Sequence, residues 1–155
     1  MITDNFLRLS GSLTAGSATG QSITATANST NVVDLSLARD VGEGEELYVS
    51  FTVGTVFATG TSLTPTVVVS AADTLTTPTT IGTAGTILTA TLVAGYTFAV
   101  RLNPQIASLG LRYLGVIYTV AGSNYTTGTM TADIVTDIQD GKKYYASGIP
   151  TLSNT

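Results

Sequence analysis

The sequence predicts an all-β protein, a jelly-roll type antiparallel β-sandwich with extended terminal arms. The chain is rich in Thr, Val, Ile and Tyr, which favour pleated, half-buried surfaces. Its apolar runs are short and alternate with a period of two, and breaks containing Gly, Pro or Asn separate them. Stretches with a helical period are scarce, so two packed sheets are the expected architecture.

The strands are expected in the following order. The clearest alternation covers residues 47–53, where the apolar side chains at 47, 49, 51 and 53 share one face. The segment 96–102 repeats this pattern and ends at Asn103-Pro104, a pair that cannot continue a central strand. Further strands are expected at 31–37, 65–70, 87–92, 111–120 and 129–138, with a possible edge strand at 2–9.

The expected strand at 111–120 differs from the others because apolar residues occupy both of its faces. Such a pattern is typical of a central strand that is covered on both sides. The second sheet would cover one face. Another element, for example a neighbouring subunit, would cover the other.

The remaining segments predict loops and arms around one domain, 1–155. Residues 10–30 are rich in Ser, Thr, Ala and Gly, and we expect a flexible arm or loop there, which either acts as a linker or becomes ordered on a partner. Residues 139–155 are expected to form a C-terminal tail that likewise becomes ordered only on a partner or stays flexible. The Thr-rich stretch 74–80 is expected to be a loop around Pro78.

The composition argues against several classes of function. The chain has no His, Cys or Trp, only 10% of its residues are charged, and its net charge is −4. Most proton carriers, thiolates and soft metal ligands are therefore missing, and we expect no enzyme, no catalytic residue, no metal and no cofactor. The six basic residues are scattered, which argues against nucleic-acid binding. We expect no membrane partner either, since no long apolar run is present.

Two groups of carboxylates are candidate sites. Asp133 and Asp137 lie four residues apart on an expected strand, too far from each other for a paired-carboxylate centre, and are interpreted as solvated. Glu43, Glu45 and Glu46 stand beside two glycines, where oxygen ligands can hold calcium. Their spacing matches no dedicated calcium loop, so a solvated turn is the preferred interpretation.

Three motifs resemble the capsid cement, or decoration, proteins of short-tailed bacteriophage heads. The first is the run 31–44, which contains Asp-Leu-x-x-Ala-Arg-Asp-x-Gly-x-Gly and precedes the strand at 47–53. The second is Leu-Gly-Leu-Arg-Tyr-Leu at 109–114, which continues through 118–122 and the strand from 128 to 137. A weaker match is Tyr-Ala-Ser-Gly at 145–148. The segment 58–91 departs from the family pattern.

The resemblance implies a jelly-roll subunit on the outer surface of an icosahedral capsid, present in the host cytoplasm during assembly. It implies two partners: the phage major capsid protein, whose neighbouring copies the subunit would clamp, and itself, as a homodimer or homotrimer. Arg39 is expected to pair with a carboxylate, inside the fold or across an interface, and the same alternatives apply to Arg112. The candidate interface or motif residues are Asp34, Arg39, Asp40, Arg112, Tyr113, Tyr144 and Tyr145.

Other classes of function remain as alternatives. A carbohydrate-binding or host-recognition module would need exposed aromatic residues, and without Trp the candidates are Tyr48, Tyr125, Tyr144 and Tyr145. A fibre or coat subunit would polymerise when purified alone, whereas a cement protein would stop at a small closed oligomer.

Overall fold

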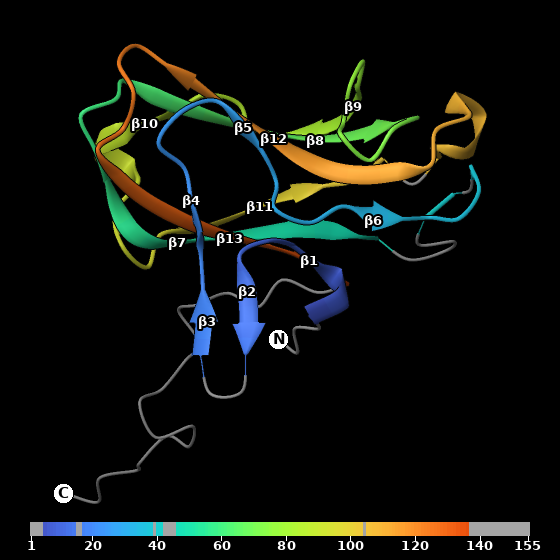
Figure 1. The fold of residues 1–155 in the computed structure, drawn as a ribbon, viewed down its shortest axis with the longest axis horizontal. Coiled ribbons are helices and arrows are strands. Elements are labelled where there is room, and N and C mark those ends of the chain that lie inside the picture. Colours follow the sequence, from blue (N-terminus) through green and yellow to red (C-terminus); the bar gives the residue numbers. More distant parts are fainter. Residues whose placement is uncertain (1–4, 15–16, 39, 42–45, 104, 137–155) are drawn as a thin grey trace, which may run out of the picture.

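The computed structural model describes residues 5–14, 17–38, 40–41, 46–103 and 105–136. Two antiparallel sheets pack face to face as the layers of a sandwich, and a short hairpin projects from it (Figure 1). Helical structure in these residues consists of three 3-10 turns: η1 (Asn5–Leu7), η2 (Thr89–Thr91) and η3 (Ala107–Leu109). None of these turns has the length and apolar character needed to cross a membrane. The all-β prediction is confirmed.

The two sheets and the hairpin contain all strands of the described residues. The first sheet has the order β1 (Arg8–Ser10), β13 (Thr127–Val135), β7 (Tyr48–Ala58), β11 (Thr97–Arg101), and β4 (Gln21–Ser22) also pairs with β13. The second sheet has the order β10 (Ile87–Leu88), β8 (Ser62–Ser70), β12 (Tyr113–Ala121), β5 (Ala27–Asn28), with β6 (Val33–Asp34) on β12 and β9 (Thr79–Thr83) on β8. The hairpin pairs β2 (Ser12–Thr14) with β3 (Ser17–Thr19).

The connections between the sheets have the character of a jelly roll. β7 and β8 are consecutive in the chain but lie in different sheets, and so do β12 and β13. β7 pairs with β13 in one layer and β8 pairs with β12 in the other. Two long ribbons of the chain therefore wrap together around the core, which is how a jelly roll forms its two sheets.

The core lies between the sheets and follows the predicted alternation. Val49, Phe51 and Val53 of β7 point inward and are fully buried, whereas Gly54, Thr55 and Val56 further along the strand are exposed. The ring of Phe51 stacks on Phe98 of β11, with 4.8 Å between centroids. It also meets the edge of Tyr118, which comes from β12 in the opposite sheet, at 6.4 Å. Phe51 therefore packs against side chains from both layers.

Several predicted strands are shorter than expected because tertiary contacts decide their ends. The edge strand expected at 2–9 is the turn η1 followed by β1 within the described residues, and the strand expected at 31–37 reduces to β6. The strand at 87–92 ends after β10, and η2 follows it. The loop expected at 74–80 ends earlier, because β9 begins at Thr79 and pairs with β8.

Residues 10–30, expected as a flexible arm or loop, contain the four short strands β2 to β5. β4 pairs with β13 in the first sheet, and β5 pairs with β12 in the second. The chain thus passes from the first sheet to the second between β4 and β5, and Gln21 stabilises this passage. Its side-chain Nε2 donates to the carbonyl of Asn28 at 2.7 Å, and its Oε1 accepts from the amide of Thr30 at 2.9 Å. The C-terminal tail, 139–155, lies outside the described residues.

At Gly115, the outer face of β12 is covered by this chain itself. Leu75, from the loop between β8 and β9, is buried on Gly115 of β12. A Cβ at residue 115 would lie 2.6 Å from Leu75 Cδ1. At this position the chain supplies the second cover that the sequence pattern predicts.

Candidate interaction site

A buried ion pair joins the first and last strands of the described chain. Arg8 Nε donates to Asp133 Oδ1 at 2.7 Å, and Arg8 Nη2 donates to Asp133 Oδ2 at 3.1 Å. The two residues face each other across β1 and β13, and each is only 5% exposed. Two parallel N–H···O bonds make this the strong, directional form of an arginine–carboxylate contact. The interpretation of Asp133 as a solvated carboxylate was wrong, because β1 covers it; Asp137 lies outside the described residues.

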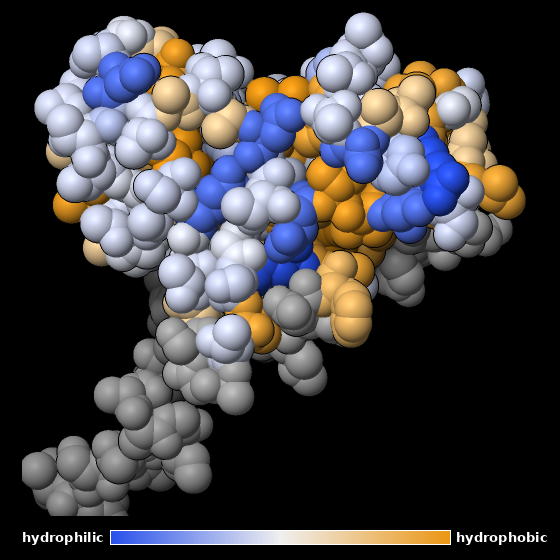
Figure 2. All heavy atoms as spheres, viewed as in Figure 1, coloured by the Kyte–Doolittle hydropathy of each residue, from blue (hydrophilic) through white to orange (hydrophobic). Residues whose placement is uncertain are grey.

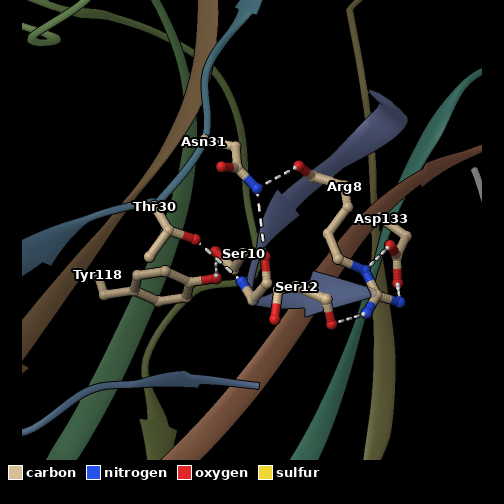
Figure 3. Close-up of polar contacts among 8 residues, drawn as sticks. Arg8, Ser10, Ser12, Thr30, Asn31, Tyr118 and Asp133 are labelled. Atoms are coloured by element: carbon tan, nitrogen blue, oxygen red, sulfur yellow. Dashed lines mark hydrogen bonds and ion pairs between the residues drawn. The ribbon is translucent and has the colours of Figure 1, made fainter. Parts of the chain in front are cut away.

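The ion pair also reaches the base of the projecting hairpin, where Arg8 Nη1 donates to the carbonyl of Ser12 at 3.1 Å (Figure 3). Asn31 adds two bonds from its side-chain Nδ2, to the carbonyls of Arg8 at 3.1 Å and Gly11 at 3.2 Å. The amide of Gly11 donates to Thr30 Oγ1 at 3.0 Å. These contacts tie the chain just before β2 to the segment 30–31.

Gly11 is required where the chain turns into the hairpin. Its φ is +89°, a conformation that side-chain-bearing residues rarely adopt. A Cβ there would lie 2.2 Å from the carbonyl oxygen of Thr19 on β3. The close approach of the two hairpin ends therefore depends on a glycine.

A second bond links the hairpin base to the opposite sheet. The hydroxyl of Ser10 in β1 lies 2.7 Å from that of Tyr118 in β12, and Tyr118 is fully buried. Burial raises the pKa of the Tyr118 hydroxyl well above its usual value. The bond from Ser10 acts in the opposite direction, and the charge of Asp133 raises the pKa further. Tyr118 is therefore a neutral hydrogen-bonding partner over the whole physiological range.

Alkaline pH should weaken the fold through Tyr118. Because its folded pKa is raised, its contribution is fully present below the unfolded value of about 10 and is lost as pH rises above that value. We expect the free energy of unfolding to fall by about 1.4 kcal/mol per pH unit above pH 10 from this one group. Tyr118→Phe should remove that slope, whereas Tyr113→Phe, a half-buried control, should keep it. Urea titrations between pH 8 and 11 measure it; equal slopes in both variants would contradict the assignment.

The hairpin itself is uncharged and projects away from the sandwich (Figure 1). No Asp, Glu, Lys or Arg occurs anywhere between Leu9 and Val33. Two hollows flank its base. One, of about 320 Å³, is lined by Phe6, Arg8, Gly11, Ser12, Asn31, Val32 and Val33. The other, of about 460 Å³, is lined by Gly11, Ser12, Thr19, Gly20, Gln21, Ser22, Thr30 and Asn31.

Figure 2 shows apolar surface beside the hairpin base, over the region of η1 and β6, with hydrophilic residues on either side. Phe6, Val32 and Val33 form the apolar lining of the smaller hollow. Apolar side chains and polar backbone groups of the hairpin base thus lie next to each other in this hollow. A surface of this kind suits contact with another protein better than chemistry on a small substrate.

Three of the predicted motif residues come together on the second sheet. Arg112 donates from Nε and Nη2 to the two carboxylate oxygens of Asp34, both at 2.5 Å. Tyr113 is the cross-strand partner of Asp34, and the guanidinium of Arg112 lies 5.1 Å from the centroid of its ring. Arg112 therefore has a carboxylate partner inside the fold and also remains open to solvent. The same atoms are exposed enough to meet a partner chain.

The other predicted motif residues either lie away from Asp34, Arg112 and Tyr113 or fall outside the described residues. Asp40 accepts a bond at 2.8 Å from the amide of Ala107, at the start of η3. Arg39, Tyr144 and Tyr145 lie outside the described residues, as do Glu43 and Glu45. Tyr125 is buried against Phe57, so it cannot serve as a sugar platform. The described residues contain no group of three or more Asp, Glu, His or Cys side chains that could hold a metal ion.

Comparison with known proteins identifies the family. A family model with the description Bbp16 matches residues 17–134. The chain belongs to the Bbp16 family. This is a bacteriophage-associated family, which agrees with the phage resemblance of the motifs. No curated protein matches the chain.

The Bbp16 match begins inside the hairpin and covers the sandwich except for β1 and the last residue of β13. Asp34, Arg112, Tyr113 and Asp133 lie within the matched span, whereas Arg8, Ser10 and Ser12 precede it. The ion pair of this Bbp16 member thus joins one residue inside the matched span to one outside it. Sequence reasoning missed Arg8; the signal was an arginine inside the apolar run Phe6-Leu7-Arg8-Leu9, where a charge needs a partner.

The exposed pair of this Bbp16 protein gives an acid-side prediction. The bond from Arg112, helped by the amide of Ser36, lowers the pKa of the Asp34 carboxyl to about 2. A lowered folded pKa means that the contribution of the pair is present above pH 4 and is lost as pH falls through about 2. NMR titration of the Asp34 carboxyl carbon should give this midpoint. Arg112→Gln should raise it toward the ordinary value, and Arg101→Gln, which breaks the exposed pair with Glu46, should not. Equal midpoints in all three proteins would refute the role of Arg112.

Proposed function

We propose that this protein is a structural component of a phage head. It binds the outside of the icosahedral shell and clamps neighbouring copies of the major capsid protein, which stabilises the mature capsid. It acts as a small closed homo-oligomer and performs no catalysis. Membership of a phage-associated family and the motif resemblance support this proposal.

The observation that carries the proposal is an uncharged hairpin held on a firm base. A two-stranded hairpin alone is at best marginally stable in water. Here Arg8 and Asn31 hold its base through partly buried bonds, and Thr30 and Asn31 add exposed bonds to Gly11. Exposed strand edges usually carry charged side chains or Pro, which block association, but residues 9–33 carry neither a charge nor a Pro. A projecting, uncharged and anchored hairpin suits insertion between the subunits of a lattice.

The clamp would act through mass action. A protein that binds only the assembled lattice stabilises it by its free energy of binding. Many copies on one shell add their contributions, so each contact can be modest. The Asp34–Arg112 pair is exposed on the second sheet. A polar contact from it would fix the position of this protein on the capsid more than it would strengthen binding.

Co-sedimentation with capsids tests the proposal. Purified protein is mixed with expanded, cement-free capsids of the matching phage, with immature shells, and with a sugar-coated resin. We expect saturable binding to expanded capsids at a fixed ratio to the capsid protein. Ala18→Asp, which places a charge on the exposed hairpin, should weaken binding at least tenfold, an amount that one buried unpaired charge readily accounts for.

A matched variant separates the hairpin from the rest of the surface. Val93→Asp adds the same charge to an exposed apolar residue in the loop between η2 and β11, and should bind as the wild type does. Equal loss in both variants would contradict a role for the hairpin. No binding to shells together with retention on the resin would instead favour the carbohydrate-binding alternative.

A further inference from the structure

The loop 71–78, between β8 and β9, has a disfavoured backbone at two positions. Leu75 has φ +53° and Thr77 has φ +48°. Neither is Gly, Asn or Asp, the residues that tolerate this region, and Thr is β-branched, which makes it less tolerant still. Two such residues in one loop persist only when other contacts hold them in place.

The contact that holds the loop is the side chain of Leu75. It is 3% exposed, although its neighbours Asp73, Thr74, Thr76 and Thr77 are exposed. It fills the space above Gly115, where a Cβ would meet Leu75 Cδ1 at 2.6 Å and Cδ2 at 3.2 Å. Glycine at 115 therefore makes room for leucine at 75.

This contact is separate from the main core. Val68 is the cross-strand partner of Gly115 and shares its face of the second sheet. Val68 and Leu75 are both buried, but neither belongs to the cluster of side chains between the sheets. The loop and the residues under it form a small apolar unit on the outer face of the sandwich.

The polar contacts of the loop are few, and one of them is exposed to solvent. Ser70 Oγ donates to the carbonyl of Thr76 at 2.6 Å, and Asn28 Nδ2 donates to the carbonyl of Thr74 at 2.9 Å. The amide of Leu75 donates to the carbonyl of Ala72 at 3.1 Å. Water can replace the exposed bond from Asn28 at small net cost, whereas Ser70 is buried and its bond adds to the cost of opening.

We propose that loop 71–78 is a strap that opens as a unit while the sandwich stays folded. In the closed state Leu75 is the plug over Gly115. Release of the two strained residues offsets part of the lost burial, so opening costs much less than unfolding. The open state exposes Val68 and the backbone of Gly115, and it turns a Thr-covered face into an apolar one. This inference does not depend on the proposed function.

Amide hydrogen exchange, read residue by residue by NMR, tests the strap. Amides at 72–77 should exchange at least tenfold faster than those of β7 and β13, because local opening precedes global unfolding. Thr77→Gly relieves strain without touching the plug and should slow exchange of the strap roughly tenfold. Thr74→Gly, a control at a residue without positive φ, should speed it, since glycine there only adds chain freedom.

Gly115→Ala tests the plug. The added Cβ displaces Leu75, so exchange at 72–77 should rise at least tenfold while amides of β7 and β13 keep their rates. Exchange of the strap at the rate of β13 in the wild type would overturn the proposal. So would a Gly115→Ala effect that is equal throughout both sheets, or slower exchange in Thr74→Gly as in Thr77→Gly.

Discussion

Replacing Asp133 by Asn should lower the free energy of unfolding by about 3–5 kcal/mol, because it leaves the buried guanidinium of Arg8 without a counter-charge. Asn keeps the size of the side chain, so no cavity contributes to the loss. It can accept one bond from Arg8 but presents an N–H₂ group where the second carboxylate oxygen accepts from Nη2. A loss of this size is a large share of the 5–15 kcal/mol that typically stabilises a domain. Urea unfolding followed by circular dichroism measures it.

A double variant provides the control for this prediction. Arg8→Met combined with Asp133→Leu replaces both charges by apolar side chains of similar length. Exchange of a buried ion pair for packed apolar residues is often neutral or stabilising, so the double variant should recover most of the stability lost by Asp133→Asn. A double variant as unstable as the single one would show that the hydrogen bonds of Arg8 matter more than its charge.

The pair also makes a functional prediction possible, since Arg8 holds the carbonyl of Ser12 at the hairpin base. The double variant loses this bond while the sandwich stays folded. If the proposed clamp depends on an anchored hairpin, the double variant should bind capsids more weakly than its stability alone would suggest. Capsid binding at wild-type strength would mean that Asn31 and Thr30 suffice to hold the base.

The long strands could be predicted from the sequence because their own residues determine them. The alternation at 47–53 and 96–102 places Val49, Phe51 and Val100 inward without reference to any partner. The short strands are different. β4 and β5 have only two residues each and no period that could be read. They exist because β13 and β12 present unpaired edges to a Thr- and Ser-rich segment that carries no apolar pattern of its own.

The candidate site divides in the same way. The sequence could indicate Asp34 and Arg112 as separate motif residues but could not predict that they pair. They lie 78 positions apart, and the register of the strands brings them together. Arg8 and Asp133 lie 125 positions apart, and Asp133 stands where a solvated residue of an alternating strand would stand. Its carboxylate is covered by Arg8, which comes from β1, a neighbouring strand of only three residues. No pattern in the residues around Asp133 could predict that a side chain so distant in the sequence buries it.

Phe51→Ala should cost about 3–5 kcal/mol, the usual range for removing a buried phenylalanine ring. The loss arises from the lost transfer free energy and from the cavity left between the sheets. Two ring contacts disappear as well, the stack on Phe98 and the edge contact with Tyr118. Because Tyr118 also bonds Ser10, the change should loosen the link between the second sheet and the hairpin base.

Phe98→Ala is the matched control, since Phe98 makes the same stack but is only half-buried. We expect a clearly smaller loss from it, because solvent and neighbouring side chains can fill the space of an edge-strand residue. Urea midpoints with unchanged m-values would show that both variants keep the same native surface. If the two losses were equal, the stacking contact itself would carry the effect. A larger loss from Phe51→Ala instead assigns the difference to what Phe51 alone does, which is to fill the space between the two sheets.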